Sequence, residues 1–260
     1  MVNRMNIVKY NQAAWNHQVE SGTNPWTKPV SPEVIAEARK GNFSVLLTET
    51  KPVPTHWFPP MAGKQVLGLA SGGGQQCPVF AALGANVTSF DNSQKQLEMD
   101  ELVAKREGMD NLRTICGDAS DLSVFADNTF DLIFHPVSNL FMPDVRPVWR
   151  EAYRVLKPGG VMLAGFLNPI FYIFDTLKAE KGEVDVRYKL PYADKNVPEM
   201  LRLQMDNNNP LEFGHSLSDQ IGGQLEAGFV ITGFYEDAHT GTIISEYTPT
   251  YIATRAVKGV

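Results

Sequence analysis

The sequence predicts an α/β fold built around a mostly parallel sheet, and three features support this prediction. From Gln65 onward, short apolar runs alternate with longer amphipathic stretches, which is typical of βαβ units. The first run leads into a glycine-rich turn, Ser71-Gly-Gly-Gly74, that opens a helical stretch. The last two runs have no helical stretch between them, so we expect a loop to join them and the two strands to be antiparallel.

The strands and helices can be placed along the chain in order. The first helix is expected to end at Gly84, and the second opens with Ser93 and Gln96 in a capping-box pattern. A third helix, at about 145–156, is stopped by Lys157-Pro-Gly-Gly160. The apolar runs that form strands lie at residues 65–70, 86–91, 112–116, 130–134, 161–166, 229–234 and 250–254.

A further helix follows residue 215. Ser216 and Asp219 repeat the capping-box pattern at its start. Leu217, Ile221 and Leu225 follow at helical spacing, so we expect them to form its buried stripe.

The composition divides the chain into a leader and a main domain. Residues 1–62 are polar, aromatic and proline-rich, and the prolines of 51–60 suit extended connections. Residues 63–260 carry the βαβ alternation, which residues 168–213 interrupt with mixed charges and prolines. We therefore expect a leader that packs on the domain as a lid, and a cap inserted at about 168–213.

Charge and composition exclude several classes of protein. The net charge is −6, with 23 basic against 29 acidic residues, which disfavours a nucleic-acid-binding protein. Cys77 and Cys116 form no Cys-x-x-Cys pair, and the histidines lack metal-ligand spacing, so no metal is expected. No signal peptide or apolar run of about 18 residues is present, so we expect a cytoplasmic protein that does not bind membranes.

Three polar features follow three successive predicted strands. The glycines of 71–74 allow a ligand to approach the backbone, although they also suit an ordinary tight turn. Asp91 follows about 20 residues later, where a carboxylate can accept both ribose hydroxyls or can simply begin a helix. Asp118 could accept from an adenine amine or could cap a loop. Together the three features indicate an adenosine-containing ligand.

At these residues the chain resembles the class I S-adenosylmethionine-dependent methyltransferases. The matching stretches are 66–74, Asp91, Gly117-Asp118, 130–134 and 151–160, the last ending in Arg-Val-Leu-Lys-Pro-Gly-Gly. The resemblance implies a Rossmann-like, doubly wound, seven-stranded sheet whose last strand is antiparallel. The chain also resembles an uncharacterised bacterial group of small-molecule methyltransferases around Trp15, 28–30 and 134–139.

The resemblance also implies where the cofactor would bind. Gly72 and Gly74 would lie against its methionine and ribose portions, Asp91 would hold the ribose, and Asp118 would face the adenine. The expected cofactor-binding residues are Ala70, Ser71, Gly72, Gly74, Gln76, Asp91, Asn92, Ser93, Gly117, Asp118, Ala119 and His135.

Two departures from the family pattern stand in the glycine-rich region. The family usually carries an acidic residue where this sequence has Gly68, and a glycine where it has Ala70. The acidic residue commonly helps to anchor the amino group of the cofactor, so the anchor in this chain stays open.

His135 is the candidate catalytic residue. It follows the fourth strand, and a neutral imidazole could take a proton near pH 7, or it could be a hydrogen-bonded structural histidine. Aromatic faces suit a sulfonium, although Tyr10, Trp15 and Trp26 could equally anchor the leader. The candidate residues on the acceptor side are Trp15, Trp26, Ser138, Asn139 and His215.

These features predict an S-adenosylmethionine-dependent methyltransferase that moves a methyl group to a small-molecule acceptor by in-line displacement, releasing S-adenosylhomocysteine. One alternative is a non-catalytic S-adenosylmethionine-binding regulatory protein, which Gly68 and Ala70 favour. The other is a nucleotide-dependent oxidoreductase, disfavoured because Cys77 stands where the dinucleotide fingerprint needs its third glycine. The acceptor and the oligomeric state stay open.

Overall fold

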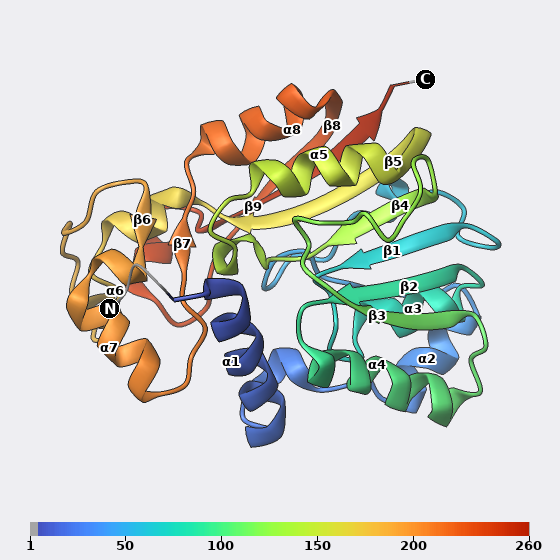
Figure 1. Cartoon of the computed structure of the whole chain (residues 1–260), viewed down its shortest axis with the longest axis horizontal. Coiled ribbons are helices and arrows are strands. Elements are labelled where there is room, and N and C mark those ends of the chain that lie inside the picture. The colour runs from blue at the N-terminus through green and yellow to red at the C-terminus, as the bar shows by residue number, and fades with distance from the viewer. Residues whose placement is uncertain (1–4, 260) are drawn as a thin grey trace.

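The computed structural model describes residues 5–259, and its centre is a seven-stranded sheet in the order β3-β2-β1-β4-β5-β9-β8 (Figure 1). The first five strands are parallel, and β9 runs antiparallel to both of its neighbours, β5 and β8. The predicted α/β fold with an antiparallel last strand is therefore confirmed. The strands of this sheet are β1 (Gln65–Leu69), β2 (Asn86–Asp91), β3 (Leu112–Cys116), β4 (Phe130–His135), β5 (Leu156–Leu167), β8 (Phe229–Asp237) and β9 (Tyr251–Lys258).

Helices cover both faces of the sheet, as alternating side chains of the strands require. Val66 and Leu132 point to the face covered by α2 (Pro32–Arg39), α3 (Gln76–Ala82) and α4 (Gln94–Glu107). Their neighbours Leu67 and Ile133 point to the opposite face, where α5 (Arg146–Val155) packs with the buried side chain of Trp149. All four strand residues are fully buried, so β1 and β4 form the centre of the core.

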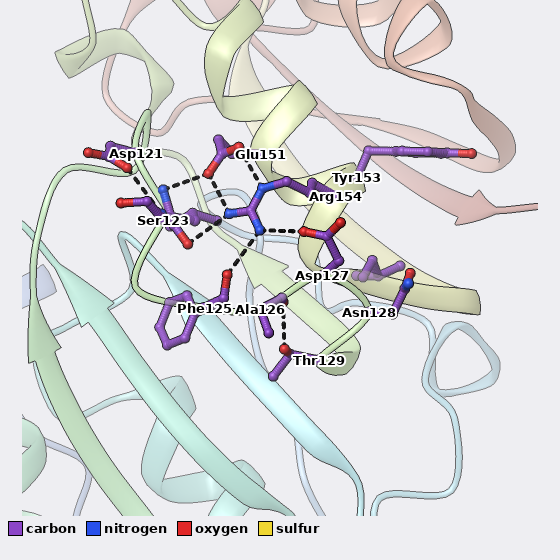
Figure 2. Close-up of polar contacts among 12 residues, drawn as sticks. Asp121, Ser123, Phe125, Ala126, Asp127, Asn128, Thr129, Glu151, Tyr153 and Arg154 are labelled. Atoms are coloured by element: carbon purple, nitrogen blue, oxygen red, sulfur yellow. Dashed lines mark hydrogen bonds and ion pairs between the residues drawn. The ribbon is translucent and has the colours of Figure 1, made fainter.

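Arg154 in the last turn of α5 holds the loop between β3 and β4 against the helix (Figure 2). Its guanidinium donates to the carbonyl oxygens of Leu122 and Phe125, at 2.8 and 2.9 Å. It also pairs with the carboxylates of Glu151 at 2.7 Å and Asp127 at 2.8 Å. These contacts explain why an arginine stands in the Arg-Val-Leu-Lys-Pro-Gly-Gly stretch.

The leader contains two helices, α1 (Ile7–Ser21) and α2, which the sequence did not predict; both precede the proline-rich residues 51–60. The buried residues of α1 are Asn11 and Ala14, so its inner face lacks the large apolar residues that reveal a helix in a sequence. Asn6 caps α1 by accepting from the backbone of Lys9, and Gly22 ends it in the left-handed conformation.

Residues 168–213 form a small layer beside the main sheet (Figure 1). It contains α6 (Thr176–Ala179), α7 (Pro198–Asp206) and a two-stranded antiparallel sheet of β6 (Tyr192–Ala193) and β7 (Phe213–Gly214). Asn11 of α1 joins the leader to this layer, because its side chain accepts from Leu211 N and donates to Leu211 O. We call residues 168–213 the cap.

The helix after residue 215 differs from its prediction. It begins as a single π-helical turn, Ser218–Gly222, and continues as α8 (Gly223–Ala227). Leu217 and Leu225 are exposed, so the predicted apolar stripe is wrong. Gln220 and Gln224 face the core instead, because their side-chain oxygens accept hydrogen bonds from Asn139 and Thr254. Within residues 5–259, no helix combines the length and the apolar character needed to cross a bilayer.

Candidate functional site

A cavity of about 530 Å³ runs along the edge of the sheet where the parallel strands end. One half lies over the ends of β1, β2 and β3, and the other lies over β4, β5 and the start of β9. The leader contributes residues of α1 and of 46–49 to its wall, and the cap contributes Phe171 and Glu212. Ligands of open α/β sheets bind at this edge.

The glycine-rich turn after β1 is held in shape by two carboxylates. Gly72 N donates to Asp91 Oδ2 at 3.1 Å, and Gly74 N donates to Asp100 Oδ1 at 3.1 Å. A Cβ atom at Gly72 would lie 2.7 Å from Gln96 Cβ, so a side chain does not fit there. The turn therefore presents backbone to the cavity, as a ligand lying against it requires.

Asp91 organises this turn and also faces the cavity. Its Oδ1 accepts from Ser93 N at 2.8 Å, while Oδ2 accepts from Gly72 N. Burial raises the pKa of the carboxyl, and the backbone hydrogen bonds act in the opposite direction. Each oxygen keeps one lone pair for a hydroxyl group in the cavity.

Asp118 lies beyond the end of β3 on the same cavity wall. Its Oδ1 accepts from the backbone N and the hydroxyl of Ser120, both at 2.9 Å. No described residue donates to Oδ2, so this oxygen is available to an amine donor.

Gln96 supplies an independent sign that a ligand belongs in this half. Its Oε1 is buried without a hydrogen-bond partner among the described residues, and Gln96 lines the cavity. A buried acceptor without a partner is costly unless a donor occupies the space beside it. With the glycine turn, Asp91 and Asp118, this atom makes the residues present fit an adenosine-containing cofactor.

The structure explains the two departures in the glycine-rich region. A Cβ atom at Gly68 would lie 2.1 Å from Cys77 Sγ, so the cysteine occupies the space that an acidic side chain would need. Burial raises the pKa of the Cys77 thiol well above its usual value, so the space holds a neutral group. Ala70 has a φ of 48°, a left-handed conformation that explains why the family places a glycine here.

His135 lies beneath the cavity rather than in its wall. It is fully buried; its Nδ1 lies 2.7 Å from Leu69 O, and its Nε2 contacts the side-chain amide of Asn139. Burial lowers its pKa while the hydrogen bonds with Leu69 O and Asn139 act in the opposite direction, and its ring packs edge-on against Trp149. These contacts are those of a structural histidine, which was the alternative left open for this residue.

The remaining candidates divide between the cavity wall and the surrounding protein. Asn139 Nδ2 donates to Gln220, and His215 Nε2 lies 3.1 and 2.9 Å from the carbonyl oxygens of Asn139 and Met142. Gly74, Ser93, His135, Asn139 and His215 do not line the cavity. The predicted residues that line it are Trp15, Trp26, Ala70, Ser71, Gly72, Gln76, Asp91, Asn92, Gly117, Asp118, Ala119 and Ser138.

The aromatic residues of the leader have different positions. Trp15 lines the cavity and packs edge-on against Phe141, with 5.0 Å between ring centroids. Trp26 also lines it and is 43% exposed. Tyr10 instead donates a hydrogen bond to Asn209 O of the cap at 3.1 Å, so it anchors the leader.

Sequence reasoning missed the polar residues of the other half of the cavity. Glu49 comes from the leader and Glu212 from the cap. His239 lies in the loop between β8 and β9, and Tyr251 begins β9. All four lie outside the stretches that resemble a known family. Their only signal is spatial, because the chain brings them together from three distant segments.

The sequence is similar to those of known proteins, both in the central part of the chain and over nearly its whole length. Residues 67–164 match the family described as "Methyltransferase domain". Over 254 residues the chain is 50% identical to the uncharacterized methyltransferase YbaJ of Bacillus subtilis (strain 168), covering 97% of this chain and 98% of that protein.

Solved structures of other proteins have a similar fold. An S-adenosylmethionine-dependent methyltransferase from Mesorhizobium loti superposes with a TM-score of 0.59 at 18% identity, covering 78% of this chain and 94% of that one. The 1,6-didemethyltoxoflavin-N1-methyltransferase of Burkholderia thailandensis has a TM-score of 0.57 at 14% identity, covering 97% of this chain and 88% of that one. The second likeness therefore includes the leader and the cap.

Proposed function

Because the chain belongs to the methyltransferases, we propose that it transfers the methyl group of S-adenosylmethionine to a small-molecule acceptor bound in the same cavity. The observation that carries this proposal is the cavity itself. It places the glycine turn, Asp91 and Asp118 in one half and leaves a second, mostly apolar half beside them. A cofactor and an acceptor would thus meet at one edge of the sheet.

The cofactor half is assigned to residues on three adjacent strand ends. Asp91 would hold the ribose hydroxyls, Asp118 Oδ2 would accept from the adenine amine, and Gly72 would lie against the methionine portion. Gln96 Oε1 offers an acceptor for a further donor of the cofactor. The other residues proposed to contact it are Ala70, Ser71, Gln76, Asn92, Gly117 and Ala119.

The acceptor half favours a small molecule. The whole cavity, about 530 Å³, lies within the roughly 300–1,000 Å³ typical of small-ligand sites. The leader and cap contribute to its walls, which leaves less room for a polymer than for a small molecule. Its apolar lining residues are Leu46, Leu47, Val137, Leu140, Phe141, Leu167 and Phe171.

Methyl transfer depends mainly on aligning the acceptor with the methyl group of the cofactor. When bound, S-adenosylmethionine supplies a methyl group on a sulfonium, which is already activated toward a nucleophile. The cavity walls would hold the acceptor in line with that methyl group and exclude water, and such orientation accounts for about 7–11 kcal/mol of a barrier. Trp15 and Trp26 would offer aromatic faces to the positive charge. We assign His135 a structural role beneath the site, because neither ring nitrogen faces the cavity.

Calorimetry with S-adenosylmethionine, S-adenosylhomocysteine and NAD tests the cofactor assignment. We expect both sulfur ligands to bind and NAD not to bind; tight binding of NAD alone would overturn the proposal. Release of S-adenosylhomocysteine during a metabolite screen then tests transfer. Binding of both sulfur ligands without release for any metabolite would favour the non-catalytic alternative.

A further inference from the structure

Glu212 lies in the acceptor half of the cavity with one carboxylate oxygen uncommitted. It precedes β7 in the cap, and its Oε2 accepts from the hydroxyl of Tyr172 at 2.9 Å. No described residue donates to Oε1, although Glu212 is one of the residues that line the cavity. The side chain therefore offers a hydrogen-bond acceptor to whatever occupies this half.

The second carboxylate of this half, Glu49, is already occupied by the protein. It accepts from the backbone and hydroxyl of Thr240, from the hydroxyl of Tyr251 at 3.2 Å, and contacts His239 Nδ1. His239 Nδ1 also lies 2.9 Å from the Tyr251 hydroxyl. Of these two glutamates, Glu212 is therefore the one that keeps an oxygen for a ligand.

The charge on the cavity wall is of one sign. Its described lining includes no lysine or arginine. An anionic acceptor would meet like charge with no cation to neutralise it. The carboxylates that line the cavity are Glu49, Asp91, Asp118, Asp144 and Glu212.

The surroundings of Glu212 disfavour the ionised form of its carboxyl group when no cation is nearby. Burial and the nearby carboxylate of Asp194 raise the pKa of Glu212 to about 7, and the hydrogen bond from Tyr172 opposes this only in part. Glu212 also helps to raise the pKa of Tyr251, together with Glu49, so both carboxylates act on that side of the cavity. A cation placed at Oε1 would relieve this cost.

We propose that the acceptor is an apolar molecule carrying a basic nitrogen, and that Glu212 binds this nitrogen through a charge-assisted hydrogen bond. The apolar skeleton would lie against residues such as Leu47, Leu140 and Phe171, which share the cavity wall with Glu212. This inference rests on the proposed function, because it takes the second half of the cavity as the acceptor site. It names the class of acceptor and the residue that selects it.

Matched probes test the proposal on the full chain saturated with S-adenosylhomocysteine. Benzylamine, benzyl alcohol and benzoate share one skeleton, as do cyclohexylmethylamine, cyclohexylmethanol and cyclohexanecarboxylate. Ligand-observed NMR should rank each amine about tenfold or more above its alcohol, with the carboxylate weakest, as a charged hydrogen bond implies. Glu212→Gln should remove this preference and leave alcohol binding unchanged. Glu183→Gln, which neutralises an exposed carboxylate of the same cap, should preserve the preference.

The pH dependence of amine binding by the unaltered protein gives a second, mutation-free readout. The charged and titratable groups around Glu212 are Tyr172, Tyr192, Asp194 and Tyr251, with Glu49 and His239 in the same half of the cavity, and burial keeps the three tyrosine hydroxyls protonated. Affinity for a protonated amine should therefore rise from about pH 6 to about pH 8 as Glu212 ionises, because only the ionised carboxylate attracts the cation. Alcohol binding should not follow this profile.

The outcomes separate this inference from the proposed function. If S-adenosylhomocysteine binds but the amines bind no better than the alcohols or carboxylates, or no probe binds, the amine assignment is overturned and the cofactor assignment stands. If S-adenosylhomocysteine itself does not bind, both are overturned. A preference that survives in Glu212→Gln overturns the role of Glu212.

Discussion

Asp91 is the residue on which the cofactor half depends most. Its carboxylate fixes the glycine turn through Gly72 N and the start of α4 through Ser93 N, while facing the cavity. The same side chain thus shapes the site and offers acceptors to a ligand. The sequence left two roles open for it, holding a ribose or beginning a helix, and the structure places it both at the start of α4 and in the cavity wall.

Replacing Asp91 by alanine should weaken S-adenosylhomocysteine binding by about 1–3 kcal/mol, the scale of a lost hydrogen bond to a charged group. Asp91→Asn should lose less, because an amide oxygen can still accept. Calorimetry measures both, with Asp110→Ala as an exposed control outside the cavity. An unchanged dissociation constant in Asp91→Ala would remove Asp91 from the site.

His135, unlike Asp91, does not line the cavity and contributes to the stability of the core. Its removal in His135→Ala would leave Leu69 O and Asn139 Oδ1 without the imidazole as their partner in the core, so we expect a loss of about 2–3 kcal/mol in the free energy of unfolding. Denaturant melts measure this, with exposed His17→Ala as the control. Activity should fall only with the folded fraction. A stable variant with normal cofactor affinity and greatly slowed turnover would restore the catalytic hypothesis.

At the scale of the element, the predicted strands lie close to where the structure has them, because buried parallel strands are continuous apolar runs bounded by turns. Helix α1 of the leader and the buried face of the last helix were harder to predict. Their buried faces carry Asn11, Gln220 and Gln224, which pair with polar groups of distant segments. A polar residue that is buried because it finds a distant partner looks exposed in a sequence.

Arg154 of α5 allows the contribution of one helix-to-loop contact to stability to be measured. Arg154→Met removes the donors that hold Leu122 O and Phe125 O and leaves Glu151 and Asp127 without their shared partner. We expect the free energy of unfolding to drop by about 1–3 kcal/mol. Thermal or urea melts check this against Arg150→Met, an exposed arginine on the same helix. An equal free energy of unfolding for the two variants would show that the contacts of Arg154 contribute nothing to stability.

At the scale of the whole molecule, the cavity exists because three parts of the chain meet at one edge of the sheet. The βαβ core contributes the cofactor half, while the leader and the cap close over it and are joined to each other through Asn11. The core half could be predicted, since its residues follow successive strands. The acceptor half could not, because Glu49, Glu212, His239 and Tyr251 are brought together only by the folded chain.

The net charge of −6 is consistent with the acidic lining of the cavity. Part of the acidic excess lines the cavity, which suits a cationic sulfonium and an acceptor without negative charge. The described residues also bring together no group of three or more side chains suited to hold a metal ion.

We expect one cavity to hold the cofactor over β1, β2 and β3 and the acceptor beside it. A crystal structure of the protein with S-adenosylhomocysteine tests it most directly. We predict the ribose hydroxyls at Asp91, the adenine at Asp118, and the sulfur directed toward the half of the cavity that contains Glu212. Density for the ligand outside this cavity, or with its adenine in the Glu212 half, would contradict the account.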